Sequence, residues 1–173
     1  MFHSIARARR TAAVAIGVAL ASAGLALAVA GAPKVEVSIL AEREVVRTDA
    51  SGRSSVVREP VAIANPGDVI VYTLTAKNTG DAPALDPRIE DPLPSGTLLL
   101  LDSVETGGAA VGASLDGGKT WQPFPARVER RRDDGTTERV PAPAEAYTIL
   151  RWTFPDPLGP GESKDVRFKV RIR

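Results

Sequence analysis

The stretch Asn65–Pro94, NPGDVIVYTLTAKNTGDAPALDPRIEDPLP, contains the clearest strand pattern in this chain. An Asn-Pro-Gly-Asp turn at 65–68 precedes the run Val69–Lys77, and an Asn-Thr-Gly-Asp turn at 78–81 follows it. Within this run apolar residues recur at every second position, which is the period of a half-buried strand. One face would carry Ile70, Tyr72, Leu74 and Ala76, and the other Val69, Val71, Thr73, Thr75 and Lys77. The sequence therefore predicts a strand whose first face packs on a core.

Similar patterns recur along the chain, and Pro and Gly residues interrupt them at short intervals. We predict strands over Val35–Ile39, Thr97–Val104, Tyr147–Phe154 and Val166–Arg173, and polar hairpins over residues 44–58 and 127–140. The further residues expected to point inward are Leu150, Trp152, Phe154, Val166, Phe168 and Val170. After residue 33 no amphipathic helix pattern is present. Many short strands separated by turns indicate an all-β, antiparallel β-sandwich.

Three blocks of sequence, in this order, resemble the DUF11 family of bacterial and archaeal surface repeats. They are the Gly-Asp to Asn-x-Gly strand segment at 67–80, Asp-Pro-Leu-Pro at 91–94 and Pro-Gly-Glu-Ser at 160–163. The resemblance covers residues 61–173 and implies an immunoglobulin-like β-sandwich outside the cytoplasm, without implying a reaction. Residues 31–60, with their strand and polar hairpin, are expected to fold with it as one unit.

Residues 1–30 have the composition of an export signal. Three arginines and no acidic residue lie in the first ten positions, and residues 11–30 carry no charge and end in Ala-Val-Ala. This pattern indicates a signal peptide, with the mature chain beginning near Gly31. The apolar part also approaches the length of a membrane span, so an uncleaved anchor helix is the alternative. The predicted location is periplasmic, cell-surface or extracellular.

The charge balance argues against nucleic acid as a partner. The whole chain has a formal net charge of +1, but residues 1–30 contain three of its 22 basic residues and none of its 21 acidic ones, so the remainder carries −2. There is no Cys, and the one His lies at position 3. Catalysis by a Ser-His-Asp or Cys-His arrangement, and zinc bound by His or Cys, therefore cannot be built from residues 31–173. We expect no cofactor.

The segment Ser114–Trp121, SLDGGKTW, matches the Ser-x-Asp-x-Gly-x-Thr-Trp pattern of the Asp-box. This pattern resembles a turn found in sialidase-type propellers and other secreted β-proteins, where it is structural even in enzymes. The carboxylate would accept hydrogen bonds from turn amides, and the glycines permit positive φ. We therefore expect Ser114, Asp116, Gly118, Thr120 and Trp121 to form a structural turn between two strands.

Two further groups of charged residues are candidate sites. Arg127, Arg130, Arg131 and Arg132 lie on the second predicted hairpin, among acidic residues; a solvated surface is the main interpretation and a partner surface the alternative. Oxygen ligands for Ca²⁺ could come from Asp86, Glu90, Asp91, Asp116, Asp133 and Asp134. No EF-hand spacing organises these acids, so we expect solvated turn residues and no metal site.

The sequence favours a non-enzymatic, exported module with a structural or protein-interaction role at the bacterial cell envelope. Its expected partners are envelope or surface proteins, and it would contact the membrane only through residues 11–30 if these are not removed. A carbohydrate-binding or cell-wall-binding sandwich is the alternative, which would require exposed aromatic residues. A secreted hydrolase that uses two carboxylates is the third hypothesis, and no recognisable cluster supports it.

Overall fold

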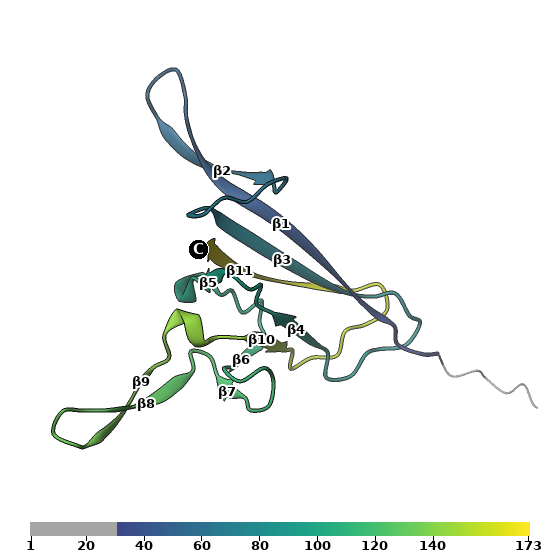
Figure 1. Ribbon diagram of the computed structural model, residues 1–173. Coiled ribbons are helices and arrows are strands. Elements are labelled where there is room, and N and C mark those ends of the chain that lie inside the picture. Colours follow the sequence, from purple (N-terminus) through teal and green to yellow (C-terminus); the bar gives the residue numbers. More distant parts are fainter. Residues whose placement is uncertain (1–30) are drawn as a thin grey trace, which may run out of the picture.

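The computed structural model describes residues 31–173, which form an all-β protein with antiparallel sheets and two short 3₁₀ helices (Figure 1). The elements are β1 (Val35–Thr48), β2 (Ser54–Pro60), β3 (Val69–Asn78), β4 (Arg88–Pro92), β5 (Thr97–Leu99), η1 (Leu101–Ser103), β6 (Ala110–Ser114), β7 (Gln122–Pro123), β8 (Arg127–Arg131), β9 (Thr137–Pro141), η2 (Ala144–Ala146), β10 (Ile149–Thr153) and β11 (Ser163–Ile172). The expected N-terminal signal or anchor helix lies outside the described residues. Within residues 31–173 no helix has the length and apolar character that a membrane span requires.

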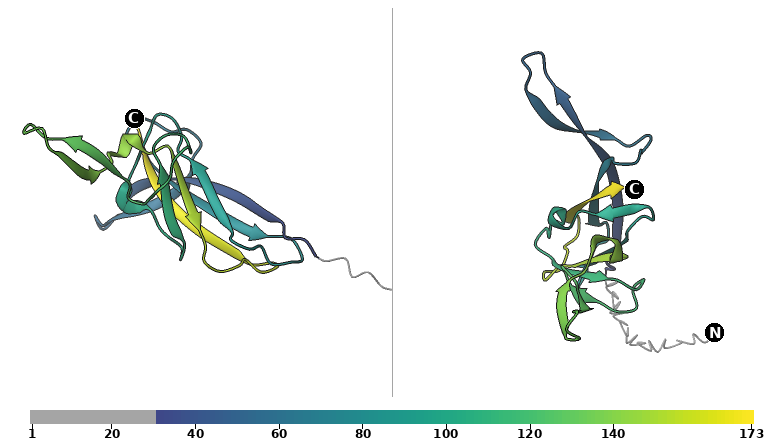
Figure 2. Two further views of the ribbon diagram at one scale, coloured as in Figure 1. Left: turned by 90° about the horizontal axis from the view of Figure 1, so that it is seen from below. Right: turned by 60° about the vertical axis from the view of Figure 1, so that its left-hand side comes forward.

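Two sheets pack against each other, as expected for a β-sandwich. One has five strands in the order β2-β1-β3-β11-β5, and the other has four in the order β4-β10-β6-β7. Strands β8 and β9 form a third, two-stranded sheet. Both long hairpins, β1–β2 and β8–β9, extend away from the packed sheets in each view (Figure 2). The two predicted polar hairpins therefore exist as projections from the sandwich.

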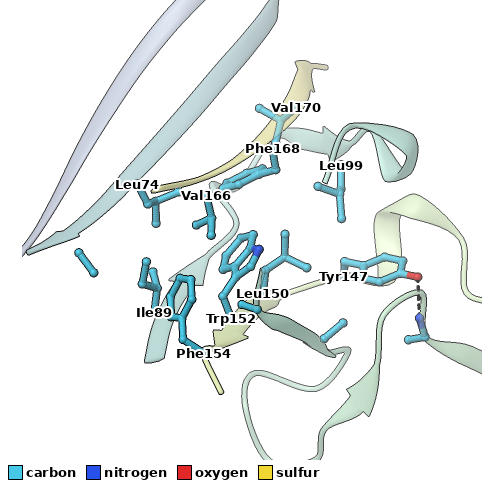
Figure 3. Packing of buried hydrophobic residues seen from close by; sticks show 14 of the residues in the cluster. Leu74, Ile89, Leu99, Tyr147, Leu150, Trp152, Phe154, Val166, Phe168 and Val170 are labelled. Atoms are coloured by element: carbon cyan, nitrogen blue, oxygen red, sulfur yellow. Dashed lines mark hydrogen bonds between the residues drawn. The ribbon is translucent and has the colours of Figure 1, made fainter. Parts of the chain in front are cut away.

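Aromatic side chains at the centre of the core join the two main sheets (Figure 3). Phe168 on β11 stacks on Trp152 of β10 at 5.9 Å between ring centroids, and on Tyr72 of β3 at 5.3 Å. Trp152 and Phe168 are fully buried, whereas Tyr72 is half-buried at the margin of the core. The indole N–H of Trp152 donates to the carbonyl of Glu105, so its polar atom is satisfied. The other side chains predicted to point inward are also buried: Ile70, Leu74, Leu150, Phe154, Val166 and Val170.

Val71 lies on the strand face opposite the core, as the alternation predicts, and yet it is buried. Its side chain is only 1% exposed. Lys169 on β11 is its neighbour across the sheet, and the Lys169 ammonium contacts Glu44 on β1 at 2.8 Å. This ion pair spans β3 from one side to the other, because β3 lies between β11 and β1. The aliphatic stem of Lys169 therefore covers Val71, an effect that alternation along one strand does not reveal.

The predicted buried strand over Thr97–Val104 is correct only for its first three residues. Strand β5 ends at Leu99, and the chain turns into the 3₁₀ helix η1. Ser103 explains the turn, because its hydroxyl donates to the carbonyl of Leu100 and accepts from the N–H of Lys169. A side chain that bonds the backbone in this way competes with a strand ladder. The polar residue after the leucines therefore ended the strand early.

Two other predicted boundaries differ from the structure. The strand predicted over Val35–Ile39 and the first arm of the hairpin at 44–48 are one continuous strand, β1, which pairs with β3 along residues 35–43 and with β2 along 42–48. The strand predicted to begin at Tyr147 begins at Ile149, after the helix η2. Tyr147 instead packs into the core, where its hydroxyl accepts a hydrogen bond from the N–H of Ala126 (Figure 3).

Candidate functional site

The turn at 114–121 connects β6 to β7 and is organised by one carboxylate. Oδ1 of Asp116 accepts from the Thr120 N–H at 2.9 Å and from the Ser114 hydroxyl at 2.8 Å. The Thr120 hydroxyl donates to Oδ2 of Asp116 at 2.6 Å. These bonds, those from Thr120 above all, stabilise the ionised form and lower the pKa of Asp116 to about 2.

The remaining residues of the pattern complete the same turn. The Gly118 N–H donates to the buried Ser114 hydroxyl at 2.8 Å, and Gly118 has φ of +90°, a conformation that a side chain would strain. Trp121 follows the turn directly before β7. The guanidinium carbon of Arg151 lies 3.4 Å from the centroid of the Trp121 ring, in a cation–π arrangement. Ser114, Asp116, Gly118 and Thr120 thus share one set of hydrogen bonds, and Trp121 lies beside them under Arg151.

Arg151 connects this turn to the edge of the four-stranded sheet. Its Nε donates to Oε1 of Glu90 on β4 at 2.8 Å while its guanidinium covers Trp121. A shallow, mostly apolar depression borders Trp121 and Arg151. Since Arg151 covers one face of the indole, that face is not a flat platform for a sugar ring. The sequence patterns did not point to Arg151, because its position over Trp121 depends on the pairing of β10 with β6.

The β8–β9 hairpin carries the arginines predicted as a possible partner surface. Glu138 on β9 accepts hydrogen bonds from Arg130 at 2.6 Å and from Arg132, and these bonds lower the pKa of its carboxyl. Arg127 instead donates to the carbonyl of Arg139 at 3.1 Å. Arg131 has no carboxylate partner among residues 31–173. Most of the run is therefore paired within the hairpin, as a mixed-charge surface would be.

The hairpin is attached to the sandwich at its base only. Ala126 and Ala142 are buried there, and the Ala142 N–H donates to the Ala126 carbonyl at 2.8 Å. The hydroxyl of Tyr147 accepts from the Ala126 N–H at 3.0 Å. Beyond this base, most residues of the hairpin are exposed. The base of the hairpin is therefore part of the core, whereas its arginine-bearing tip lies outside the core.

The acidic residues considered as calcium ligands do not gather at one place. Among residues 31–173 no three Asp or Glu side chains lie close enough together to hold a metal ion. Glu90 pairs with Arg151, Asp116 holds its own turn, and Asp134 accepts from the hydroxyl and N–H of Thr136. Asp86 is exposed with φ of +48°, and Asp133 is exposed in the hairpin turn. Asp91 differs, because it is buried on the core side of β4 and this burial raises its pKa to about 6.

Comparisons with protein-family models, with curated proteins and with solved structures find no match for this chain.

Proposed function

We propose that this protein is a non-enzymatic, exported module of the bacterial cell envelope that acts through contacts with envelope or surface proteins. The observation that carries the proposal is the separate β8–β9 hairpin, which is attached only at its base and exposes charged side chains along its length. Exposed segments on a rigid scaffold commonly provide binding surfaces. Arg131, which lacks an internal partner among residues 31–173, offers this surface a cation for an acidic group.

Export is the second part of the proposal. The basic start, the uncharged apolar stretch and the Ala-Val-Ala ending of residues 1–30 support a signal peptide with cleavage near Gly31, or an anchor if cleavage does not occur. The antiparallel sheets and the order of the sequence blocks support an immunoglobulin-like sandwich of the DUF11 type. The proposed location is the periplasm, the cell surface or the exterior.

A contact role is better supported than catalysis or sugar binding. Its support is that no three acidic side chains of residues 31–173 gather at one place, while Asp116 is bonded within its own turn and Glu90 is paired with Arg151. Sugar binding would favour an exposed aromatic platform, whereas Trp152 is buried and Arg151 covers Trp121. Hydrolysis of a glycan or peptide panel by the purified chain would contradict the non-enzymatic assignment.

A shortened hairpin tests the contact role without disturbing the core. The Ala126–Ala142 hydrogen bond places Val128 and Val140 at the next hydrogen-bonded pair of the ladder. Replacing residues 129–139 by Asn-Gly would close the hairpin there with a two-residue turn. The full chain carrying this replacement should fold normally. In intact cells it should no longer crosslink to the proteins that crosslink to the parent chain.

A charge variant provides a second test of the same surface. Arg131→Glu keeps the hairpin and the ion pairs of Glu138 with Arg130 and Arg132. It reverses the charge at position 131, which has no ion-pair partner among residues 31–173. We expect Arg131→Glu to weaken the same crosslinks that the shortened hairpin abolishes. An unchanged crosslinking pattern for the shortened hairpin, with the protein correctly folded, would remove this hairpin as the contact surface.

A further inference from the structure

The first half of β1 has an unpaired edge and an uncovered apolar face. Strand β2 pairs only with residues 42–48 of β1, so residues 35–41 pair with β3 on one side and with no strand of residues 31–173 on the other. The exposed fractions of Val35, Val37 and Ile39 are 38%, 48% and 55%. Exposed edges of this kind are sites where another strand can pair.

These three side chains point to the same side of the sheet as the core. Val37 and Ile39 are register partners of Ala76 and Leu74 on β3, which are almost completely buried. Partners in a ladder share one face of the sheet. The four-stranded sheet therefore covers this face at β3 but does not extend over β1.

The backbone groups of the same residues are available for a new ladder. The Lys34 carbonyl accepts from the Thr79 N–H, and the Lys34 N–H donates to Oδ1 of Asn78, so the peptide groups of Lys34 point toward β3. Peptide groups alternate between the two sides of a strand. Val35, Val37 and Ile39 therefore direct their N–H and C=O groups toward the free edge.

We propose that this free edge, residues 35–41 of β1, pairs antiparallel with the same edge of a second copy of the chain, so that the five-stranded sheets of two copies join. A second copy fits this edge because the segment VEVSILA is compatible with itself in one register. When Val37 lies opposite its own counterpart, Val35 lies opposite Ile39 of the other copy, and the reverse pair follows from the two-fold symmetry. Three apolar cross-strand pairs then lie on one face, and Glu36 lies opposite Ser38.

Two neighbouring registers also place the outward-pointing peptide groups of the two strands opposite each other, but both are less favourable. Centring the two-fold axis on Ser38 would bring Lys34 of the second copy opposite Glu42, a position that Pro60 of β2 already occupies. Centring it on Glu36 would place two glutamates directly opposite each other, which is destabilising. The register centred on Val37 fits residues 34–40 of each copy into the edge before Pro60.

This proposed interface rests on the proposed contact role of the protein. It identifies a second copy of the chain as the partner for the free edge of β1. It is short and has no aromatic anchor among its pairing residues, so we expect a weak, concentration-dependent dimer of the transient class. Its failure would leave the hairpin experiment unaffected, because β8 and β9 belong to a different sheet.

Cysteine crosslinking of the full chain tests the register, and the absence of native Cys makes the result unambiguous. Under mild oxidation in membranes or cell extracts, Val37→Cys should form a disulfide-linked dimer. The matched control is Val46→Cys, an exposed valine on the same strand where β2 already covers the edge. The proposal is supported if Val37→Cys forms the dimer and Val46→Cys does not. It is overturned if neither variant crosslinks or if both crosslink equally. Stronger crosslinking by Ser38→Cys than by Val37→Cys would overturn the register.

A charge-complementation experiment tests the same pairing without a covalent bond. Val37→Lys and Val37→Glu each place like charges opposite each other at the two-fold axis, so each variant should dimerise at least tenfold more weakly than the parent chain. Mixing the two variants should restore association, because opposite charges then face each other. Sedimentation velocity of the full-length chains measures both effects. A parent chain that stays monomeric at high concentration, or a mixture no better associated than either variant, would contradict the proposal.

Discussion

At the scale of the single residue, two carboxylates of this protein show opposite effects of their surroundings. Asp116 is exposed and receives several hydrogen bonds, which favour its ionised form and lower its pKa. Asp91 is buried beside the core, and the loss of hydration favours its neutral form and raises its pKa to about 6. The first residue organises a turn, whereas the second has a charged form that costs stability at neutral pH.

Asp91 makes the stability of the protein depend on pH. Its pKa is about 6 in the folded state and 3.8 in a reference peptide, so between these values the folded state binds more protons than the unfolded state. The contribution of Asp91 to the free energy of unfolding therefore falls as pH rises from about 4 to about 6. We expect Asp91→Asn to stabilise the protein by about 3 kcal/mol at pH 7 and to have little effect at pH 4.

Urea unfolding of both proteins at several pH values measures this difference. Asp86→Asn is a matched control, because Asp86 is an exposed carboxylate in the loop that precedes the same strand. A constant difference between Asp91→Asn and the parent protein at pH 4 and pH 7 would contradict the assignment.

At the scale of the element, one buried side chain at the end of β3 holds three segments together. Nδ2 of Asn78 donates to the carbonyls of Ala82 and Leu158, each at 2.8 Å. Its Oδ1 accepts from the N–H groups of Lys34 and Gly80. The start of β1, the turn after β3 and the loop before β11 are therefore fastened by the same amide.

Asn78→Ala should destabilise the protein by about 3 kcal/mol, because it removes the side-chain partner of the Lys34 N–H, the Gly80 N–H and the Ala82 carbonyl in a partly buried place. Thr79→Ala is the control, since it removes one long and exposed bond, from the Thr79 hydroxyl to the Lys34 carbonyl at 3.3 Å. Chemical denaturation compares the two variants. Equal stabilities would mean that the Asn78 amide does not hold these segments.

At the scale of the whole molecule, the aromatic stack of Tyr72, Phe168 and Trp152 determines how the two main sheets pack. Phe168 belongs to the five-stranded sheet and contacts Trp152 on the four-stranded sheet. Phe168→Ala would leave a cavity between the sheets and should cost about 3–5 kcal/mol.

Thermal and urea unfolding measure this loss. Arg171→Ala, on an exposed position of the same strand, should change the stability by less than about 0.5 kcal/mol. A Phe168→Ala protein as stable as Arg171→Ala would contradict the packing described here.

The all-β class could be predicted from sequence because alternation and turn residues are local properties. The inward faces of β3, β10 and β11 follow from period two, and the two polar hairpins follow from Asp-Gly and Asp-Ala-Ser-Gly turns. The turn at 114–121 could be predicted for the same reason. Ser114, Asp116 and Thr120 are close in sequence, so a local turn is enough to bring their side chains into hydrogen-bonding distance.

The features that only the tertiary structure decided depend on contacts between residues that are far apart in sequence. Val71 is covered because Lys169 reaches Glu44 across β3, and the leucine-rich strand ends early because Ser103 bonds the backbone of Lys169. The order of the strands brings Arg151 to Trp121 and leaves residues 35–41 of β1 without a second neighbouring strand among residues 31–173. The alternation of Val35, Val37 and Ile39 predicts an apolar face, but whether another sheet covers that face depends on where the second layer ends, because burial is a property of the assembled layers.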